Sequence, residues 1–340
     1  MKRLLSSIAS PLLAGALALL GVASSSEAQA ASVCVYDPAG RTGFMYKIAE
    51  GWAVQAAAWG ATVSLKPYTD EATAVNDFTA GSCDGVMASG VRLQRYNAAT
   101  YTVEAVGGVS TYELLQPVLT TLQTKSNYAP MFDAGAYETV GIWPLGAVYV
   151  FVRDRSLNSI GALSGKRVAS LDYDKASALA IQRMGGVGVS ADLATLGPAF
   201  NNGELDVLFL PATAYTPFEL WHGIGTKGGV ITTPLLQVTY QILIHDGKFP
   251  ADFGTKSRTW VASDFGTAMK AIRSAEAAIP ATSWITPTAA AKTELDGFAQ
   301  RMRLELRDKQ KAYDGRVLSL LKKARCNADA TRAECAQTLE

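Results

Sequence analysis

The sequence predicts an α/β protein with two lobes. Strand-like and helix-like segments alternate over residues 32–89 and again over residues 164–210, an order typical of a mostly parallel sheet with helices on both faces. Between these two series lie strand-like runs at 138–143 and 147–153, which we expect to mark a crossing between the lobes. The ~310 residues after the N-terminal leader exceed one common domain, in agreement with two lobes.

The first 30 residues have the order of a secretory signal peptide. Lys2 and Arg3 form a basic start, an apolar run covers 11–22, and Ala28-Gln29-Ala30 ends the segment with small residues. This is the pattern of a leader with an A-x-A cleavage site. The apolar core is about a dozen residues, whereas a membrane span needs ~20. We therefore expect cleavage after Ala30 and a protein that works in the periplasm.

Composition favours no nucleic-acid or membrane-surface partner. Removal of Lys2, Arg3 and Glu27 with the leader lowers the Lys and Arg total from 31 to 29 and the Asp and Glu total from 30 to 29. The remaining net charge is zero with neutral histidines, so no basic excess attracts polyanions. A hydrophobic content of 49% supplies ample material for a core.

The four cysteines suit an oxidising compartment, where they pair as disulfides. Cys326 and Cys335 lie nine residues apart in a polar segment, which favours a local clamp, and Cys34 would then pair with Cys83. Three pairings are formally open for four cysteines. A lipid anchor on Cys34 is the alternative, but the preceding Ala31-Ser32-Val33 does not follow the Leu-x-Gly/Ala-Cys pattern, so we favour the disulfide.

The first α/β series opens with a strand at 32–36 and the turn-rich loop 37–43. A helix follows, since apolar residues recur at helical spacing until Gly60 ends it. These apolar residues are Phe44, Ile48, Trp52, Ala56 and Trp59. The series continues with a strand, a helix and a strand at 62–68, 71–80 and 83–89.

The pattern is looser in the middle of the chain. We expect a strand at 101–109 and a helix at 112–123. The strand-like runs 138–143 and 147–153 meet at Pro144-Leu145-Gly146, and this turn-forming sequence predicts an antiparallel pair.

The second α/β series begins at residue 164, and a mostly helical segment follows it. Its expected elements are a strand at 164–170, a helix at 176–184, a glycine-rich turn at 185–188, a helix at 192–201, and strands at 206–210 and 235–244. Two helices are expected after it, at 257–278 and 288–323. The predicted division is lobe 1 at 31–123 and about 230–285, lobe 2 at about 124–229, and a C-terminal helix with a disulfide-closed tail at about 286–340.

The candidate ligand site lies on the loops that follow the strands, because open α/β sheets bind ligands beyond the carboxyl ends of their strands. Loop 37–43 brings the start of a helix to this edge, where backbone amides favour anionic groups, with Arg41 at the mouth. A tight turn with a solvated arginine is the alternative there. The candidate contacts on these loops are Gly40, Arg41, Thr69, Ser89, Arg92, Asp172, Tyr173, Thr213 and Tyr215.

Aromatic residues near these loops add a second set of candidates. Tyr36, Tyr68, Trp143, Tyr173 and Tyr215 are placed to stack on a ligand or form a wall of the site. Most aromatic residues at such places pack into the core, so we expect two of the five to touch the ligand.

The sequence lacks the common signatures of an enzyme. No G-x-S-x-G or H-E-x-x-H motif occurs, and the glycines at 223–229 lack Walker A spacing. We therefore expect neither enzymatic activity nor a cofactor. A metal site is not expected either, since there is no C-x-x-C and the two histidines, His222 and His245, are far apart in sequence.

From Gly141 to about Ile272 the order of features resembles the periplasmic solute receptors of TRAP-type transporters. The segment 160–168 (IGALSGKRV) is similar to their "dLkGlKiRv" stretch, 202–206 (NGELD) to "tGvvDg", and 249–251 (FPA) to "w..Lp.e". The chain also resembles a group of solute-binding proteins sometimes labelled as RND-type efflux components. The resemblance implies the two-lobed, type II-like fold of periplasmic binding proteins, with a long C-terminal helix.

The arginine by which these receptors clamp a ligand carboxylate lies four residues after the glycine of that stretch. Here the fourth residue after Gly165 is Ala169, and an arginine stands at the second, Arg167. Residues two apart share a face of a strand but differ in depth by ~6–7 Å. Arg167 therefore either reaches the ligand or lies at the entrance of the strand.

The resemblance implies a receptor that captures a small polar solute between two lobes and passes it to the permease subunits of a membrane transporter. The solute would bear a carboxylate if Arg167 acts as the clamp. Two alternatives stay open. One is an accessory or interaction protein of an efflux or transport complex in the envelope, docking through its long charged helix. The other is an exported hydrolase that uses carboxylates of the cleft.

Overall fold

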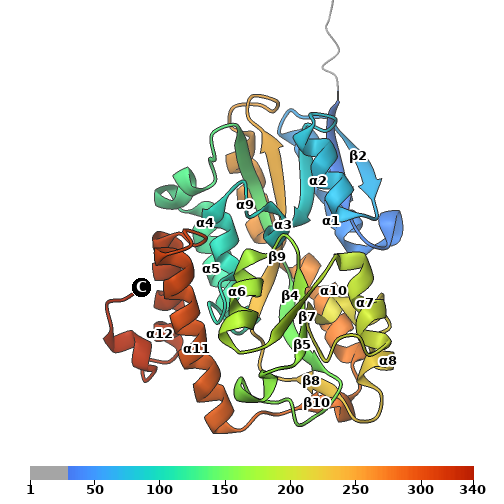
Figure 1. Ribbon diagram of the computed structural model, residues 1–340. Coiled ribbons are helices and arrows are strands. Elements are labelled where there is room, and N and C mark those ends of the chain that lie inside the picture. The colour runs from blue at the N-terminus through green and yellow to red at the C-terminus, as the bar shows by residue number, and fades with distance from the viewer. Residues whose placement is uncertain (1–29) are drawn as a thin grey trace, which may run out of the picture.

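The computed structural model describes residues 30–340, and residues 1–29, the predicted signal peptide, lie outside the described part. One sheet runs through the molecule, with strand order β2-β1-β3-β9-β4-β7-β5-β6, while β8 pairs with β4 and β10 (Figure 1). The strands are β1 (Ala31–Tyr36), β2 (Val63–Tyr68), β3 (Gly85–Ser89), β4 (Tyr137–Val152), β5 (Arg167–Leu171), β6 (Val187–Ala191), β7 (Val207–Pro211), β8 (Gly229–Ile231), β9 (Leu236–His245) and β10 (Trp284–Ile285). The α-helices are α1 (Phe44–Ala58), α2 (Glu71–Thr79), α3 (Gly90–Leu93), α4 (Ala98–Tyr101), α5 (Tyr112–Thr124), α6 (Lys175–Arg183), α7 (Leu193–Asn201), α8 (Trp221–Ile224), α9 (Phe253–Ser263), α10 (Phe265–Ala278), α11 (Ala289–Asp308) and α12 (Gly315–Ala328).

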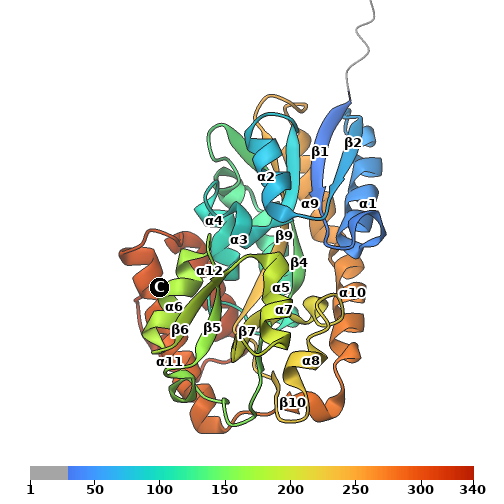
Figure 2. The ribbon, with the colours of Figure 1, turned by 45° about the vertical axis from the view of Figure 1, so that its right-hand side comes forward.

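The sheet has two halves that share its two longest strands. In the upper half of Figure 1, β1 pairs in parallel with β2 and β3, and in the lower half β5 pairs in parallel with β6 and β7. Strand β9 is antiparallel to both β3 and β4, and β4 is antiparallel to β7. Helices α1 and α2 flank the upper strands, and α6 and α7 flank the lower ones (Figure 2). The mixed α/β sheet confirms the predicted fold class, while the residue boundaries of the two lobes stay a prediction.

Short polar side chains cap the first turn of several helices that pack on this sheet. Asp70, Asp174 and Asp192 each accept a hydrogen bond from the backbone N–H three residues later. Such a cap satisfies one of the N–H groups that a helix start leaves without an intrahelical partner. The sequence therefore fixes where α2, α6 and α7 begin, at the sheet edge that the strands point toward.

The helix α1 is held by an aromatic cluster against α9. Trp52 is fully buried, its ring lies edge-to-face with Phe253 at 5.7 Å, and its Nε1 donates to Ser257 Oγ at 2.8 Å. A buried tryptophan usually needs such a partner for its indole N–H. The apolar spacing read from the sequence thus marks the face of α1 that packs on the core.

The antiparallel pair predicted at 138–153 is wrong. The chain forms one continuous strand, β4, which pairs with β9 over nearly its whole length. Pro144 and Gly146 flank a register shift in that pairing, and Gly146 has φ +133°. The sequence expected to turn the chain forms instead an irregularity within a strand, because β9 provides partners on both sides of it.

Three further expectations for the elements are wrong. Residues 101–109 are no strand, because Asn97 caps the short helix α4 and a 3₁₀ turn, Thr102–Glu104, follows it. The expected turn at 185–188 is too long: residues 185 and 186 follow α6 as a turn, but residues 187 and 188 already belong to strand β6, which pairs in parallel with β5. The expected helix 257–278 is the two helices α9 and α10.

The long C-terminal helix is two helices, α11 and α12. Lys311 has φ +55°, a left-handed conformation that interrupts a helix, and Asp314 caps the next one by accepting from Val317 N. Both helices lie at the edge of the molecule beside α5 and α6 (Figure 1).

The cysteines pair as the sequence predicts, Cys34 with Cys83 and Cys326 with Cys335. The first bridge joins β1 to the segment before β3, and the second ties the end of α12 to the C-terminal tail. The four described cysteines leave no free thiol among residues 30–340.

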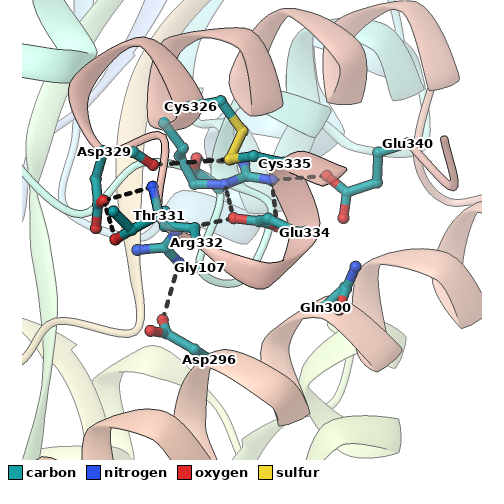
Figure 3. A network of polar contacts seen from close by, with 12 residues as sticks. Gly107, Asp296, Gln300, Cys326, Asp329, Thr331, Arg332, Glu334, Cys335 and Glu340 are labelled. Atoms are coloured by element: carbon teal, nitrogen blue, oxygen red, sulfur yellow. Dashed lines mark hydrogen bonds and ion pairs between the residues drawn. A yellow bond between two sulfur atoms is a disulfide. The ribbon is translucent and has the colours of Figure 1, made fainter. Parts of the chain in front are cut away.

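A buried ionic network, which we call the C-terminal clamp, fixes the tail. Its members are Arg303 of α11, Arg325 of α12, and Glu334 and Glu340 of the tail, whose side chains are all at most 6% exposed. Figure 3 shows Glu334 and Glu340 beside the disulfide of Cys335. The arginines also donate to the backbone carbonyls of residues 106–108, so the clamp ties the tail to a loop close to the cavity described next.

Candidate functional site

A cavity of about 270 Å³ lies between the two halves, where their parallel strands end. The end of β1 contributes Tyr36, the end of β3 contributes Ser89, and the ends of β5 and β7 contribute Leu171 and Pro211. Carboxyl ends of strands are the expected place for a ligand in an open α/β sheet. The predicted position of the site is therefore where the structure has its cavity.

Most of the cavity wall is apolar. Leu193, Leu196, Phe209 and Phe218 line it from the lower half, and Leu295, Phe298 and Leu306 of α11 close one side. Such a wall suits a ligand with an apolar body, with orientation set by a few polar groups. The polar groups that line it are the carboxylates of Asp37, Glu71, Glu104 and Asp174, four tyrosines, and three hydroxyls of serine and threonine.

Asp37 fills the helix start that the sequence offers to an anion. Its Oδ2 accepts from Met45 N at 2.9 Å and from Tyr46 N at 3.1 Å, at the N-terminus of α1. A Cβ atom on Gly43 would lie 1.9 Å from this carboxylate, so the close approach requires glycine. Burial raises the pKa of Asp37, although the hydrogen bonds from the backbone oppose the shift. The protein's own carboxylate thus occupies the expected anion position.

A cluster of Glu71, Arg92 and Tyr173 joins the two halves at the edge of the cavity. Glu71 accepts from Ser89 N at 2.8 Å and from Arg92 Nε at 3.2 Å. The guanidinium carbon of Arg92 lies 3.3 Å from the centre of the Tyr173 ring, a cation–π contact. Gln94 Nε2 also donates to the backbone carbonyl of Tyr173. Tyr173 follows β5 and the other residues belong to the upper half, so these contacts hold the halves together.

Glu104 is a deeply buried carboxylate of the cavity, at 2% exposure, the same as Asp37 and Glu71. Its Oε1 accepts from Thr239 N at 2.8 Å and from Thr239 Oγ1 at 2.5 Å. Burial raises the pKa of Glu104 to about 8, the hydrogen bonds from Thr239 oppose the shift, and the carboxylates of Asp174 and Glu71 add to it. A Cβ on Gly90 would lie 2.1 Å from Oε1, so a glycine is needed for the carboxylate to fit.

Asp174 faces the same space from the lower half. Its Oδ1 accepts from Ser177 N at 3.0 Å and so caps α6. Burial raises the pKa of Asp174 to about 6 against the opposing hydrogen bonds from the backbone. The cavity therefore holds two carboxyl groups, Glu104 and Asp174, whose protonation changes near neutral pH.

The structure brings some of the predicted site residues together and separates others. Ser89, Tyr173 and Thr213 line the cavity, as does Tyr36 of the aromatic set. Arg92 lies next to it through its contact with Tyr173. The predicted residues that do not line it are Gly40, Arg41, Thr69, Asp172, Tyr215, and the aromatic residues Tyr68 and Trp143.

Local geometry explains most of these positions. Arg41 donates to Tyr46 Oη at 3.2 Å outside the cavity, and Gly40, with φ +58°, forms the turn before α1. Asp172 is exposed, since it is Asp174 two residues later that points toward the helix start and the cavity. Tyr215 is buried in the core, where its ring stacks on Phe151.

Arg167 lies outside the cavity, at the far end of β5. It is the first residue of the strand and Leu171, the last, lines the cavity, so about 13 Å of strand separates them. Its Nη2 pairs with Asp206 Oδ1 at 2.6 Å, and the side chain is 46% exposed. The sequence leaves two positions open for Arg167, and the structure shows the second of them: Arg167 lies at the entrance of the strand, away from the cavity.

Two carboxylates that line the cavity, Glu104 and Asp174, are not among the predicted site residues, whereas the predicted Asp172 does not line it. Glu104 falls in a segment that was expected to be a strand, and its signal was a single acidic residue within the apolar run 101–109. Asp174 lies two residues after the predicted Asp172, and nothing in the sequence shows which of the two points inward. Residues distant in sequence meet at this cavity, and only the fold shows which carboxylates they are.

The described residues show no site for a metal ion. No group of three or more His, Cys, Asp or Glu side chains within residues 30–340 is arranged to hold one. Each of the four carboxylates of the cavity accepts a hydrogen bond from a backbone N–H group. None of the helices in that part of the chain is long and apolar enough to cross a membrane.

Solved structures with the same fold include TRAP periplasmic solute-binding proteins. A TRAP periplasmic solute-binding protein from Desulfovibrio salexigens, with bound orotic acid, matches with a TM-score of 0.70 at 13% identity, over 87% of this chain and 98% of that one. A second, from Desulfovibrio desulfuricans with bound sn-glycerol-3-phosphate, matches with a TM-score of 0.70 at 13% identity, over 91% and 100%. At this identity the likeness establishes the fold.

Sequence comparison establishes the family. The probable solute-binding protein AdeT1 of Acinetobacter baumannii is 35% identical over 309 residues, which cover 89% of this chain and 99% of that protein. AdeT2 of the same organism is 25% identical over 199 residues, which cover 58% of this chain and 83% of that protein. The family model described as solute-binding protein AdeT 1/2 matches residues 53–340. With a cavity at the carboxyl ends of its strands and the fold of the TRAP receptors, the chain belongs to the AdeT 1/2 family of solute-binding proteins.

Proposed function

We propose that this protein is a periplasmic receptor that captures a small organic solute between its two halves and passes it to a membrane transporter. The observation that carries the proposal is the 270 Å³ cavity, which lies where the parallel strands of both halves end. The structural relatives described above were solved with orotic acid and sn-glycerol-3-phosphate bound, and these ligands support a small molecule as the occupant here.

The contact between the halves supports a cleft that closes on its ligand. Tyr173 of the lower half stacks on Arg92 and accepts from Gln94 of the upper half. Hinge closure around a ligand is a common motion of two-lobed binding proteins. The ligand would contact Ser89, Tyr173 and Thr213, and the protein would release it unchanged, without catalysis.

A thermal-shift screen of the exported protein against small metabolites tests the proposal. A ligand present at 100 times its Kd stabilises a protein by about 2.7 kcal/mol, which raises Tm by roughly 5–10 °C. We expect saturable stabilisation and no change in the solute. Product formation would instead support an exported hydrolase. If no solute stabilised the protein and an envelope protein co-purified with it, the accessory function would replace the proposal.

A variant that fills the cavity provides the matched control. Val238 of β9 lines the cavity, so Val238→Trp should abolish the ligand-induced rise in Tm. Val54 of α1 is 70% exposed, and Val54→Trp should leave the rise unchanged. Equal rises in the two variants would show that the solute binds elsewhere.

A further inference from the structure

The ionisable groups of the cavity other than its tyrosines are all carboxyl groups. Asp37, Glu71, Glu104 and Asp174 line it, whereas within residues 30–340 no lysine, arginine or histidine does. Arg92, which lies beside the cavity, is already paired with Glu71 and stacked on Tyr173. A ligand anion would enter this space without a positive partner and beside several negative ones, which electrostatics disfavours.

The starts of α1, α2, α6 and α7 contribute to the cavity wall, and each is capped by a carboxylate of the protein, so they offer little to an anion. The amides at the start of α1 are taken by Asp37, and Ser177 N at the start of α6 is taken by Asp174. Helix N-termini and arginine side chains are the usual means of holding a carboxylate or phosphate. Here the helix N-termini are occupied by the protein's own carboxylates, and Arg167 is paired with Asp206 at the far end of β5.

Two of the four carboxylates keep an oxygen for a ligand. The hydrogen bonds that Glu104 and Asp174 receive from the described residues go to Oε1 and Oδ1. Oε2 of Glu104 and Oδ2 of Asp174 receive none from that part of the chain. Glu104 is 98% buried and lines the cavity, and Oε2 is not among the fully enclosed polar atoms that lack a partner, so it opens onto the cavity. A ligand donor in the cavity can therefore reach it, and a charged donor would form a strong, charge-assisted hydrogen bond.

Tyrosine rings line the same cavity as these two oxygens. Tyr101, Tyr173 and Tyr313 line the cavity with the two carboxylates. Tyrosine faces attract organic cations, and carboxylates accept charge-assisted hydrogen bonds from ammonium groups. The apolar wall formed by Leu193, Phe209 and their neighbours would hold the rest of the molecule.

We propose that the cavity takes an organic cation, an amine with an apolar body, whose ammonium group lies between Glu104 of one half and Asp174 of the other. This inference rests on the proposed receptor function and names the chemical class of its solute. Because the two carboxylates come from different halves, the ammonium group would also link them and favour the closed cleft.

Matched probes of different charge test the inference. n-Hexylammonium and 2-phenylethylammonium are compared with hexanoate, 3-phenylpropionate, 1-hexanol and 2-phenylethanol, by thermal shift and by isothermal titration calorimetry. We expect the ammonium probes to bind at least tenfold more tightly than the carboxylate and alcohol of the same body. Tighter binding of a carboxylate or an alcohol would overturn the inference while supporting the receptor function.

Charge-removing variants identify the carboxylates. Glu104→Gln and Asp174→Asn should each weaken the ammonium probes at least tenfold and leave the alcohols unchanged. Glutamine keeps an acceptor for Thr239 and asparagine still caps a helix, so both variants should fold, as their Tm without ligand will show. Glu50→Gln, at an exposed carboxylate of α1, is the control that should bind as the wild type does.

The outcomes separate the two proposals. Unchanged ammonium binding in both variants would overturn the assignment to Glu104 and Asp174. Failure of every probe, and of the metabolite screen, would remove the receptor function and this inference with it.

Discussion

Replacement of Glu334 by glutamine should destabilise the protein more than any surface charge change, because Glu334 is the centre of the C-terminal clamp. It accepts from Arg303 Nη2 at 2.5 Å, from Arg325 Nε and Nη2 at 2.8 and 2.9 Å, and from Arg332 Nε at 2.9 Å. After Glu334→Gln, two buried arginines share a single buried carboxylate, Glu340.

Two routes give the same magnitude for this change. Burial by itself would raise the pKa of Glu334, but the hydrogen bonds and charge of Arg325, with Arg303 and Arg332, outweigh it and hold the pKa at about 2. The ordinary value is 4.5, and each pKa unit corresponds to 1.36 kcal/mol, so ionisation of Glu334 stabilises the fold by about 3 kcal/mol. Removal of one partner from a buried ion pair typically costs about 3–5 kcal/mol.

Urea unfolding at pH 7, followed by circular dichroism, measures the effect. The free energy of unfolding should fall by about 3–5 kcal/mol and Tm by roughly 6–15 °C. Glu50→Gln removes a carboxylate from the exposed pair with Lys47 and should change the free energy by less than about 1 kcal/mol. If Glu334→Gln were as stable as the Glu50→Gln control, the clamp would not stabilise the fold and the reasoning would be refuted.

The pH dependence provides an independent check on the sign. The folded-state pKa of Glu334 lies below its ordinary value, so the stabilisation is fully present above pH of about 4.5 and is lost as pH falls through about 2. The difference in stability between wild type and Glu334→Gln should therefore be constant from pH 7 to about 5 and shrink below that. A difference that grew on acidification would contradict the ion-pair account.

Three further outcomes follow from the same structure. Arg167→Ala removes a half-exposed ion pair at the far end of β5, so it should lower the free energy of unfolding by no more than about 1 kcal/mol. Calorimetry should show unchanged affinity for the ammonium probes, and weaker binding would show that Arg167 contributes to the ligand site. Joint replacement of Cys34 and Cys83 by alanine removes a bridge between residues 49 apart and should lower the free energy of unfolding by about 4 kcal/mol on the chain-entropy estimate. Joint replacement of Cys326 and Cys335, which are 9 residues apart, should lower it by about 2.5 kcal/mol, and urea titration of both double variants measures the difference. The raised pKa of Glu104 means that the folded state holds its proton longer, so wild-type stability should fall as pH rises from 4.5 through about 8, whereas Glu104→Gln should lack this loss in Tm measured across that range.

Elements with a strong local pattern could be read from the sequence, and elements decided by a distant partner could not. The helix α1 follows its apolar spacing from Phe44 to Ala58. In contrast, the turn sequence at Pro144 and Gly146 lies within a single strand, since β9 pairs with β4 on both sides of it. Pairing between segments about 100 residues apart leaves no local signal.

The candidate site shows the same limit at the level of single residues. The sequence indicates the loops that meet at the cavity, because carboxyl ends of parallel strands share an edge. It does not indicate that Asp174 rather than Asp172 points inward, nor that Glu104, in a segment expected to be a strand, lies beside them. The position of Asp174 depends on where α6 begins, and the position of Glu104 depends on the 3₁₀ turn after α4. Long-range packing decides how both elements face the cavity.

The sequence by itself determined the α/β class, the resemblance to the TRAP receptors and the edge of the sheet where we expect a ligand, and it favoured the two disulfide pairs that the structure shows. These properties follow from short-range periodicity, cysteine spacing and the rule that connects strand direction to ligand position. The tertiary structure alone decided the charge of the cavity, because Asp37, Glu71, Glu104 and Asp174 come from four separate segments. A net charge near zero for the whole chain conceals a local excess of carboxylates, since only folding brings side chains distant in sequence to the wall of one cavity.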